Sequence, residues 1–351
     1  MDGRTHRFGT IATLAVVLVA GMTATAEAKD KRDLTVMTQN LYVGASLAPV
    51  NAATTPFEFI VAAATIYAEV QFTDYPARAD AVAAEIEANA PDLVALQEVT
   101  SWTSTGPGAP PSLDFLAILR QDLAARGLSY SVAASSNNAH VGPVPLLLCS
   151  GPFGSCLLTL QDQDVVLVND GNASLNTFNP RTARYVAQQV QTTPAGPLSF
   201  NRSWASIDGT LDGKTFRFVT THLEIEDFPA IQEAQAREIL AGPAKFAGAV
   251  IAAGDFNSAA DGSTTRSYAI LTKAYFEDAW DTNPGDPGYS CCQSDTLTNA
   301  TSALASRIDL VLTHGAARAL ESHLVGNAPF QASAPFWPSD HAGVVATVRL
   351  Q

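Results

Sequence analysis

Short apolar runs bordered by an acid, amide or imidazole side chain recur along this chain and constrain its fold more than any other feature. Apolar runs of this kind are typical of buried strands. The patterns over 57–71 and 79–90 predict two amphipathic helices, which lie between the run that ends at Asn40 and the run that ends at Glu98. Strands interleaved with helices, with a hairpin signal at 211–213, predict an α/β architecture with mixed sheets. The polar residues beside the runs are Asn40, Glu98, His222, Asp255, Asn257, Asp309, Asp340 and His341.

The placement of these polar residues indicates a shared site. Each alone has an ordinary explanation, such as a turn residue at Asn40 or a satisfied core histidine at His222. An α/β sheet, however, usually presents its ligands at the ends of its strands, where all of them recur. Together they offer a base, an acid that can orient it, and oxygen ligands for a hard cation. Phosphoester hydrolysis requires this combination.

The first residues predict export. Arg4 and Arg7 precede a short apolar stretch, and Ala26-Glu27-Ala28 matches the small-x-small pattern that signal peptidases cut. A membrane anchor is the alternative, but the stretch is shorter than the roughly 20 residues that a spanning helix needs. We therefore expect a signal peptide over 1–28, cleavage near Ala28, and a mature protein that is secreted, periplasmic or extracellular.

The remaining segment, 29–351, fits a single catalytic domain with a Gly/Pro-rich surface insertion around 141–156. Apolar residues make up 47% of the chain and charged residues 15%, the balance of a globular protein. The net charge of −14 argues against processive binding of nucleic acid, because such binding usually needs a basic face. A nuclease is still compatible with it, since a bound cation and a few Arg or Lys side chains can offset the charge locally.

Four cysteines suit an exported protein. A bridge between Cys149 and Cys156 would close a short loop and stabilise it by roughly 2–3 kcal/mol. Cys291 and Cys292 are adjacent, and a trans peptide holds neighbouring Cα atoms about 3.8 Å apart, below the usual disulfide range of about 4.4–6.8 Å. A vicinal bridge and cross-pairing to the first loop both stay open. No histidine follows at the ligand spacing of a zinc site.

Six motifs occur in order along the chain: Thr38-Gln39-Asn40, Leu96-Gln97-Glu98-Val99, Thr221-His222-Leu223, Gly254-Asp255-Phe256-Asn257, Arg307-Ile308-Asp309 and Ser339-Asp340-His341. They resemble the motifs of the endonuclease/exonuclease/phosphatase superfamily, which includes deoxyribonuclease I, exonuclease III, bacterial neutral sphingomyelinases and inositol polyphosphate 5-phosphatases. Any one motif is weak, whereas six in the family's order are specific. The resemblance implies a four-layered α/β/β/α sandwich of two mixed β-sheets flanked by helices, and metal-dependent cleavage of phosphoester bonds.

The resemblance also implies a role for each matched residue. Glu98 and Asn40 would supply oxygen ligands for Mg²⁺, with Mn²⁺ or Ca²⁺ as alternatives, and Asp340 would lie on the metal side. His341 would be the general base, because imidazole titrates near neutral pH. Asp309 would accept from its far nitrogen and so fix its tautomer.

The substrate phosphate is assigned to a second group of residues. By the same resemblance, Asp255 would hold the attacking water, while Asn257 and His222 would donate to phosphate oxygens. Family members often carry a further polar residue on a middle strand that contacts the phosphate or the leaving group. Asp162 and Asp164 are the candidates here, and we favour Asp164 because the apolar run that follows it resembles the family's strand.

Two features bear on the substrate. Phe336 and Trp337 directly precede the last motif and would contact a membrane surface peripherally, as in the bacterial sphingomyelinases, or would simply pack on the end of the sheet. Arginines that could contact a nucleic-acid backbone are scattered, at Arg181, Arg184 and Arg202, and form no basic stripe.

The sequence thus predicts a secreted Mg²⁺-dependent phosphoesterase that hydrolyses a phosphodiester or phosphomonoester by in-line attack of water with a His base. Its substrate would be nucleic acid, a phospholipid or a small phosphate ester, so nuclease and sphingomyelinase- or phospholipase-C-like activities both stay open. The alternative of another class is a catalytically inactive surface-binding module, and the complete set of catalytic residue types argues against it. No obligate protein partner is indicated.

Overall fold

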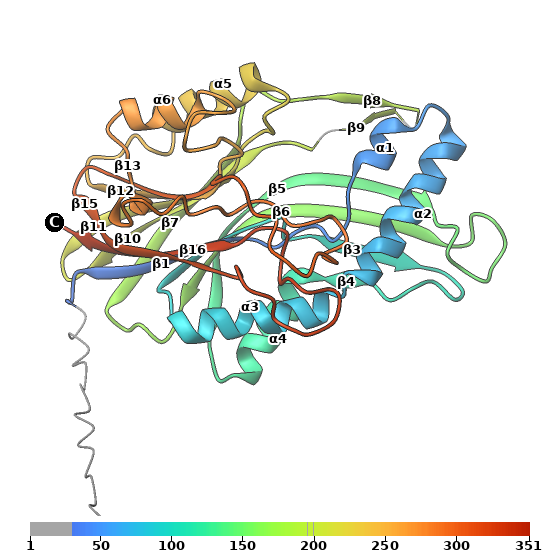
Figure 1. Ribbon diagram of the computed structural model, residues 1–351, viewed down its shortest axis with the longest axis horizontal. Coiled ribbons are helices and arrows are strands. Elements are labelled where there is room, and N and C mark those ends of the chain that lie inside the picture. Colours follow the sequence, from blue (N-terminus) through green and yellow to red (C-terminus); the bar gives the residue numbers. More distant parts are fainter. Residues whose placement is uncertain (1–29, 195, 199) are drawn as a thin grey trace, which may run out of the picture. The chain divides into compact units, whose positions relative to one another are not determined.

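Two mixed β-sheets form the centre of the structure (Figure 1). The computed structural model describes residues 30–194, 196–198 and 200–351, so the predicted signal peptide over 1–28 lies outside the described residues. In the larger sheet the strand order is β15-β16-β1-β2-β6-β3-β4, with β5 paired to β6. Its strands are β1 (Asp33–Asn40), β2 (Leu93–Gln97), β3 (Ser101–Thr105), β4 (Leu113–Asp114), β5 (Tyr130–Pro145), β6 (Leu157–Asn169), β15 (Ala317–Val325) and β16 (Gly343–Leu350).

The smaller sheet has the order β13-β14-β12-β11-β10-β7, and a separate two-stranded ribbon joins β8 to β9. The strands of the sheet are β7 (Leu175–Arg184), β10 (Ser203–Leu211), β11 (Lys214–His222), β12 (Ala249–Asp255), β13 (Glu277–Asp278) and β14 (Asp309–His314), and those of the ribbon are β8 (Gln191–Thr193) and β9 (Gly196–Leu198). The helices are α1 (Ala48–Ala52), α2 (Pro56–Phe72), α3 (Tyr75–Asn89), α4 (Phe115–Ala125), α5 (Pro229–Ala241) and α6 (Ser267–Lys273), with one 3-10 turn at Ala279–Thr282.

The layers follow from how apolar side chains alternate along the strands. On β1, Val36 faces the core between the two sheets, where it meets residues such as Phe218 and Ile251 of the smaller sheet. Met37, one residue later, joins the other core, beneath α2, α3 and α4. A third core buries Ile239 of α5 against the outer face of the smaller sheet. The predicted four-layered α/β/β/α arrangement is therefore confirmed, with α5 and α6 on one side and α3 and α4 on the other (Figure 1).

Each sheet contains one parallel pair among antiparallel neighbours, and this positions the site. β1 runs parallel to β2, and β11 runs parallel to β12. The carboxyl ends of parallel strands lie at the same edge of a sheet. Asn40 at the end of β1 therefore lies beside Gln97 of β2, and His222 at the end of β11 lies beside Asp255 of β12. Beneath this edge a polar bridge joins the sheets, because Gln97 of β2 donates to the Thr220 hydroxyl of β11 at 3.0 Å.

Local signals set the helix boundaries. Thr55 and Glu58 form a capping box at the start of α2, with Pro56 in the first helical turn. Helix α5 ends at Ala241, because Gly242 and Pro243 follow and proline cannot continue the hydrogen-bond ladder. Among the described residues, no helix is both long and apolar enough to cross a membrane.

The stretch predicted as an insertion at 141–156 is the tip of a long hairpin. Residues 141–145 continue β5, which pairs with β6 through several bulges, and Leu146 is buried in the core under α2. Cys149 and Cys156 are bonded across the tip, as one of the predicted pairings required. The other two cysteines form the vicinal bridge, Cys291–Cys292, so cross-pairing does not occur.

Candidate active site

The strand ends bring the predicted residues of both sheets together. Asn40 of β1 donates through Nδ2 to Glu98 Oε1 at 3.1 Å and to Asp255 Oδ2 at 3.2 Å. Its own Oδ1 accepts from the Tyr42 N–H at 2.9 Å. In this arrangement Asn40 holds the carboxylates of the two sheets in place as a donor, and its assignment as a metal ligand stays a prediction.

His341 and Asp309 form the central pair of the site. His341 Nδ1 lies 2.8 Å from Asp309 Oδ2, and both side chains are buried. Burial lowers the pKa of His341, but the charges of Asp309, Asp340 and Asp255 and the hydrogen bond to Asp309 together outweigh it, and the pKa is raised well above its usual value. The second nitrogen, Nε2, lies 3.9 Å from both Asp255 Oδ2 and Asp340 Oδ1. A histidine whose Nδ1–H is held by a carboxylate presents Nε2 as the basic atom.

Two serine hydroxyls hold this pair in register. Ser339 Oγ donates to the Asn40 carbonyl at 2.7 Å and accepts from the His341 N–H at 3.2 Å. These two hydrogen bonds explain why a serine begins the last motif. Ser290 Oγ accepts from the Asp309 N–H at 3.1 Å. Sequence reasoning missed Ser290, because it lies in an irregular segment with no periodic signal.

Asp255 sits opposite Asp309 in the β12–β14 register. Burial, with the charge of Asp309 as the next cause, raises the pKa of Asp255 to about 7. Its Oδ1 accepts from the Asn257 N–H at 2.8 Å, and its Oδ2 lies 3.4 Å from His222 Nε2. Burial lowers the pKa of His222 well below the usual value, so the ring is neutral at pH 7.

The backbone around Asp255 explains why its motif contains a glycine at 254 and an asparagine at 257. Asn257 has a φ of 47°, in the left-handed region that Asn tolerates better than most residues. Its Nδ2 donates to the Leu223 carbonyl at 3.0 Å, which leaves the second amide hydrogen for a ligand. A Cβ at Gly254 would overlap the Thr221 carbonyl oxygen of the neighbouring strand, so this glycine permits close backbone approach and does not form a turn.

A cleft of about 360 Å³ opens beside this cluster. Glu98, His222 and Asp340 line it, as does Arg202, which pairs with Glu224 at 3.4 Å. Arg202 is the one Arg or Lys among the described residues that line the cleft.

Of the two candidates on the middle strand, Asp162 lies nearer the cleft than Asp164. Asp162 lines the cleft and accepts from Asn138 at 3.1 Å, whereas Asp164 is fully buried between the sheets and does not line the cleft. Both belong to β6 and are two residues apart, so both point inward, but Asp162 is nearer the edge where the site lies. The apolar run after Asp164 marks the buried part of the strand, and a contact of Asp164 with the phosphate stays a prediction.

Arg78 is a buried cation behind the site, and no pattern in the sequence singles it out. It is fully buried on α3 and donates to the carbonyls of Leu41 at 2.7 Å and Pro338 at 2.9 Å. Its guanidinium also lies over the Tyr75 ring, 5.1 Å from the centroid. Arg78 therefore ties the end of β1 to the segment that carries Ser339.

The aromatic residues before the last motif pack against the protein itself. Trp337 is 1% exposed and donates through Nε1 to the Asn299 carbonyl. Phe336 is half-buried and packs with Trp337, Tyr42 and Leu297. The peripheral membrane contact through Phe336 and Trp337 is thus not supported, and the alternative of packing on the sheet end holds.

The model of the endonuclease/exonuclease/phosphatase family matches residues 37–341. The chain belongs to this family. Proteins of the family from Beutenbergia cavernae (22% identity, 91% of this chain and 72% of that chain, TM-score 0.56) and Leptotrichia buccalis (16%, 90% and 100%, 0.56) have similar structures. So does D. rerio TDP2 complexed with single strand DNA product (15%, 90% and 99%, 0.53). No curated protein sequence matches the chain.

The family acts on phosphoester bonds with the help of a metal, and the donors at this site suit a hard cation. Glu98 and Asp340 line the same cleft, and burial, with the charge of Glu98, raises the pKa of Asp340 to about 7. A divalent cation between them would relieve this cost. Glu98 has a φ of 54°, and its Oε2 accepts from the Val43 N–H at 2.7 Å, so an unusual backbone holds its carboxylate in the cleft.

Proposed function

We propose that this protein is an exported, Mg²⁺-dependent phosphodiesterase in which His341 acts as the general base. The observation that carries the proposal is the His341–Asp309 pair, whose Nε2 is aimed at the space beside Asp255 and Asp340. Asp309 keeps the proton on Nδ1, so that Nε2 can accept a proton from water. The nearby Asp255 carboxylate can hold that water by a second hydrogen bond.

The remaining residues bind the phosphate group and the cation. Glu98 and Asp340, with Asn40 beside them, would hold Mg²⁺, with Mn²⁺ or Ca²⁺ as alternatives; the cation neutralises charge on the phosphoryl oxygens and the leaving group when bound. His222, kept neutral by burial, lines the cleft and would donate to a phosphate oxygen there, as would the second hydrogen of the Asn257 amide. Such preorganised donors stabilise the charge that develops on a phosphoryl oxygen.

Export is supported by the signal-peptide pattern at 1–28 and by the two disulfides, which form most readily in oxidising compartments. The substrate class is supported by the cleft. The lining of the cleft is acidic, and Arg202 is the one Arg or Lys among the described residues that line it. Such a cleft suits a single phosphodiester better than a long duplex that needs many basic contacts. D. rerio TDP2 was solved with a single-strand DNA product, which keeps nucleic acid among the candidates beside phospholipids and small esters.

A substrate panel tests the proposal. The purified protein is incubated with Mg²⁺, with and without chelator, on plasmid DNA, a single-stranded oligonucleotide, sphingomyelin vesicles, inositol phosphates and bis(p-nitrophenyl) phosphate. We expect chelator-sensitive turnover of at least one phosphodiester. Absence of metal-dependent turnover on every substrate would contradict the enzymatic function and favour the binding-module alternative.

A further inference from the structure

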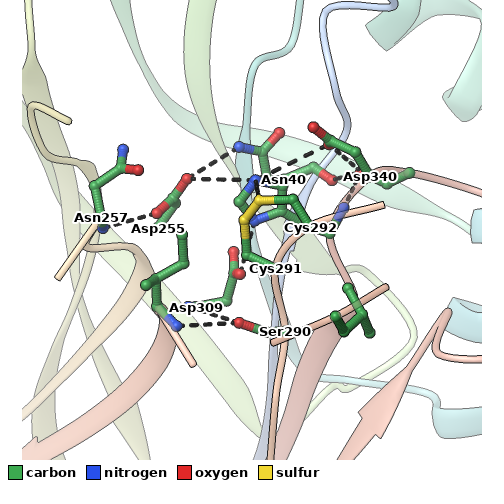
Figure 2. The surroundings of a disulfide bond; sticks show 12 residues. Asn40, Asp255, Asn257, Ser290, Cys291, Cys292, Asp309 and Asp340 are labelled. Carbon is green, nitrogen blue, oxygen red and sulfur yellow. Dashed lines mark hydrogen bonds and ion pairs between the residues drawn. A yellow bond between two sulfur atoms is a disulfide. The ribbon is translucent and has the colours of Figure 1, made fainter. Parts of the chain in front are cut away.

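The two adjacent cysteines lie inside the site, on a segment that joins its two halves (Figure 2). The Cys291 N–H donates to the Ser306 carbonyl at 2.9 Å, three residues before Asp309. On the other side the Gln293 N–H donates to the Asp340 carbonyl at 2.8 Å. The Cys291–Cys292 pair therefore sits between the residues that carry the orienting acid and those that carry the base.

The sulfur atoms approach the basic nitrogen itself. Cys292 Sγ lies 3.8 Å from His341 Nε2, and one ligand atom from each of the three residues Cys291, Cys292 and His341 falls within 4.8 Å of the others. On a tetrahedral zinc ion with Zn–S of about 2.3 Å and Zn–N of about 2.0–2.1 Å, sulfur and nitrogen ligands lie about 3.6 Å apart. The observed separation is close to this value.

The donor chemistry differs from that of the rest of the cleft. Two sulfurs and an imidazole are soft or borderline donors that suit Zn²⁺, whereas the carboxylates of Glu98 and Asp340 suit Mg²⁺. In the structure the sulfurs are bonded to each other, and a disulfide has no thiolate with which to bind a metal. The oxidation state of the pair thus decides whether soft donors are present beside the base.

We propose that Cys291, Cys292 and His341 form a redox-gated Zn²⁺ site that switches off the general base. Attack by one thiolate of a dithiol reductant on Cys292 Sγ, which belongs to an exposed residue, forms a mixed disulfide and releases the Cys291 thiolate. The reductant's second thiol then displaces Cys292. The two sulfurs gain two electrons, the reductant becomes a cyclic disulfide, and two thiols remain on the protein.

Zinc binding follows from this reduced form. As the two thiols lose their protons, Zn²⁺ takes both sulfurs and Nε2 of His341, and the carboxylates 3.9 Å from that nitrogen offer a fourth ligand. Nε2 can then no longer accept a proton from water. Oxidation of the pair by a disulfide of the surroundings expels the ion and frees the base. The inhibitory part of the proposal rests on the proposed function, and the zinc-binding part does not.

The test uses two matched variants, each of which keeps one cysteine pair. C149S/C156S retains the pair in the site, and C291S/C292S retains the pair at the hairpin tip. Each protein is reduced with dithiothreitol, desalted without oxygen, and titrated with Zn²⁺ against a chromogenic chelator, beside an oxidised sample. Hydrolysis of bis(p-nitrophenyl) phosphate with excess Mg²⁺ is followed in parallel.

We expect reduced C149S/C156S to bind one zinc ion per chain at least tenfold more tightly than its oxidised form. Reduced C291S/C292S should bind no more than oxidised wild type, and H341Q in the C149S/C156S background should weaken binding at least tenfold. One equivalent of zinc should abolish turnover of the reduced protein, and reoxidation should restore it. Equal zinc uptake before and after reduction, or uptake by C291S/C292S, would overturn the proposal.

Wild-type protein provides a readout that does not depend on how the variants fold. After reduction, zinc should slow alkylation of Cys292 by N-ethylmaleimide, measured by peptide mass spectrometry, and leave Cys149 unaffected. Equal protection of both cysteines, or none, would count against the site. If the protein turns over no phosphoester at all, the proposed function fails while zinc binding can still be observed, so the two failures are distinguishable.

Discussion

Replacing Asp309 by asparagine separates the orienting acid from the rest of the site. The substitution keeps the shape of a buried side chain but removes the charge that lies 2.8 Å from His341 Nδ1. Asparagine can also turn its amide toward Nδ1 and so favour the tautomer whose proton lies on Nε2, which cannot act as a base. The β14 start and the Ser290 hydrogen bond to the backbone N–H should be unaffected.

The size of the effect follows from the charge that develops during the reaction. When His341 takes a proton it becomes an imidazolium beside Asp309, and two unit charges about 4 Å apart attract by about 4 kcal/mol at an effective dielectric constant of about 20. Each 1.36 kcal/mol changes a rate about tenfold. Allowing for partial compensation by the amide, we expect kcat to fall by about 10²–10³-fold in Asp309→Asn.

The pH dependence of activity provides a second, independent test of the role of Asp309. His341 must be neutral to act as a base, so activity should rise with pH through its raised pKa. Since the charge of Asp309 is the largest factor that raises the pKa of His341, its removal should move the acid limb of kcat/KM to lower pH while the plateau falls. A fall of less than about fivefold, or a limb that moves to higher pH, would refute the role of Asp309.

Three further predictions concern the surrounding residues. His341→Ala and Asp255→Ala should reduce turnover by orders of magnitude with little change in Tm, whereas a proportionate loss of stability would mark both residues as structural. Arg78→Met should destabilise the fold by about 3–5 kcal/mol in urea denaturation, because it leaves the Leu41 and Pro338 carbonyls without their buried donor; a loss below about 1 kcal/mol would contradict this. The pKa of Asp340 is raised in the folded state to about 7, so its contribution to stability falls as pH rises from about 4 towards 7. Asp340→Asn should therefore raise Tm at pH 8 without metal, while Mg²⁺ at 100 times its Kd should stabilise wild type by about 2.7 kcal/mol and the variant by less; equal metal responses would argue against Asp340 as a ligand.

The sequence predicted the ends of the strands well, because each of these strands is a buried apolar run that a polar residue terminates. The apolar run from Val250 to Ala253 is typical of an interior strand, and the polar residues after it lie at the carboxyl end of β12. The family motifs then supplied the partners that are distant in sequence, such as Asp309 for His341. Neither pattern reaches the irregular segments.

What was missed depends on tertiary contacts. Ser290 and the vicinal cysteines lie in a segment without regular structure, and only the fold places them beside Asp309 and His341. Residues 141–145 read as a Gly/Pro-rich loop, yet pairing with β6 and its bulges keeps them in a strand. Trp337 beside a motif suggested an exposed contact, but burial of its ring and a partner for its N–H decide its position.

Hydrolysis in H₂¹⁸O tests the central mechanism most directly. With Mg²⁺ and a phosphodiester that the protein turns over, water attack at phosphorus directed by His341 predicts one ¹⁸O atom in the phosphate-containing product, and none in the alcohol product. This labelling should be abolished by chelator and by His341→Ala. Label in the alcohol product, or labelled phosphate that persists after chelation, would contradict it.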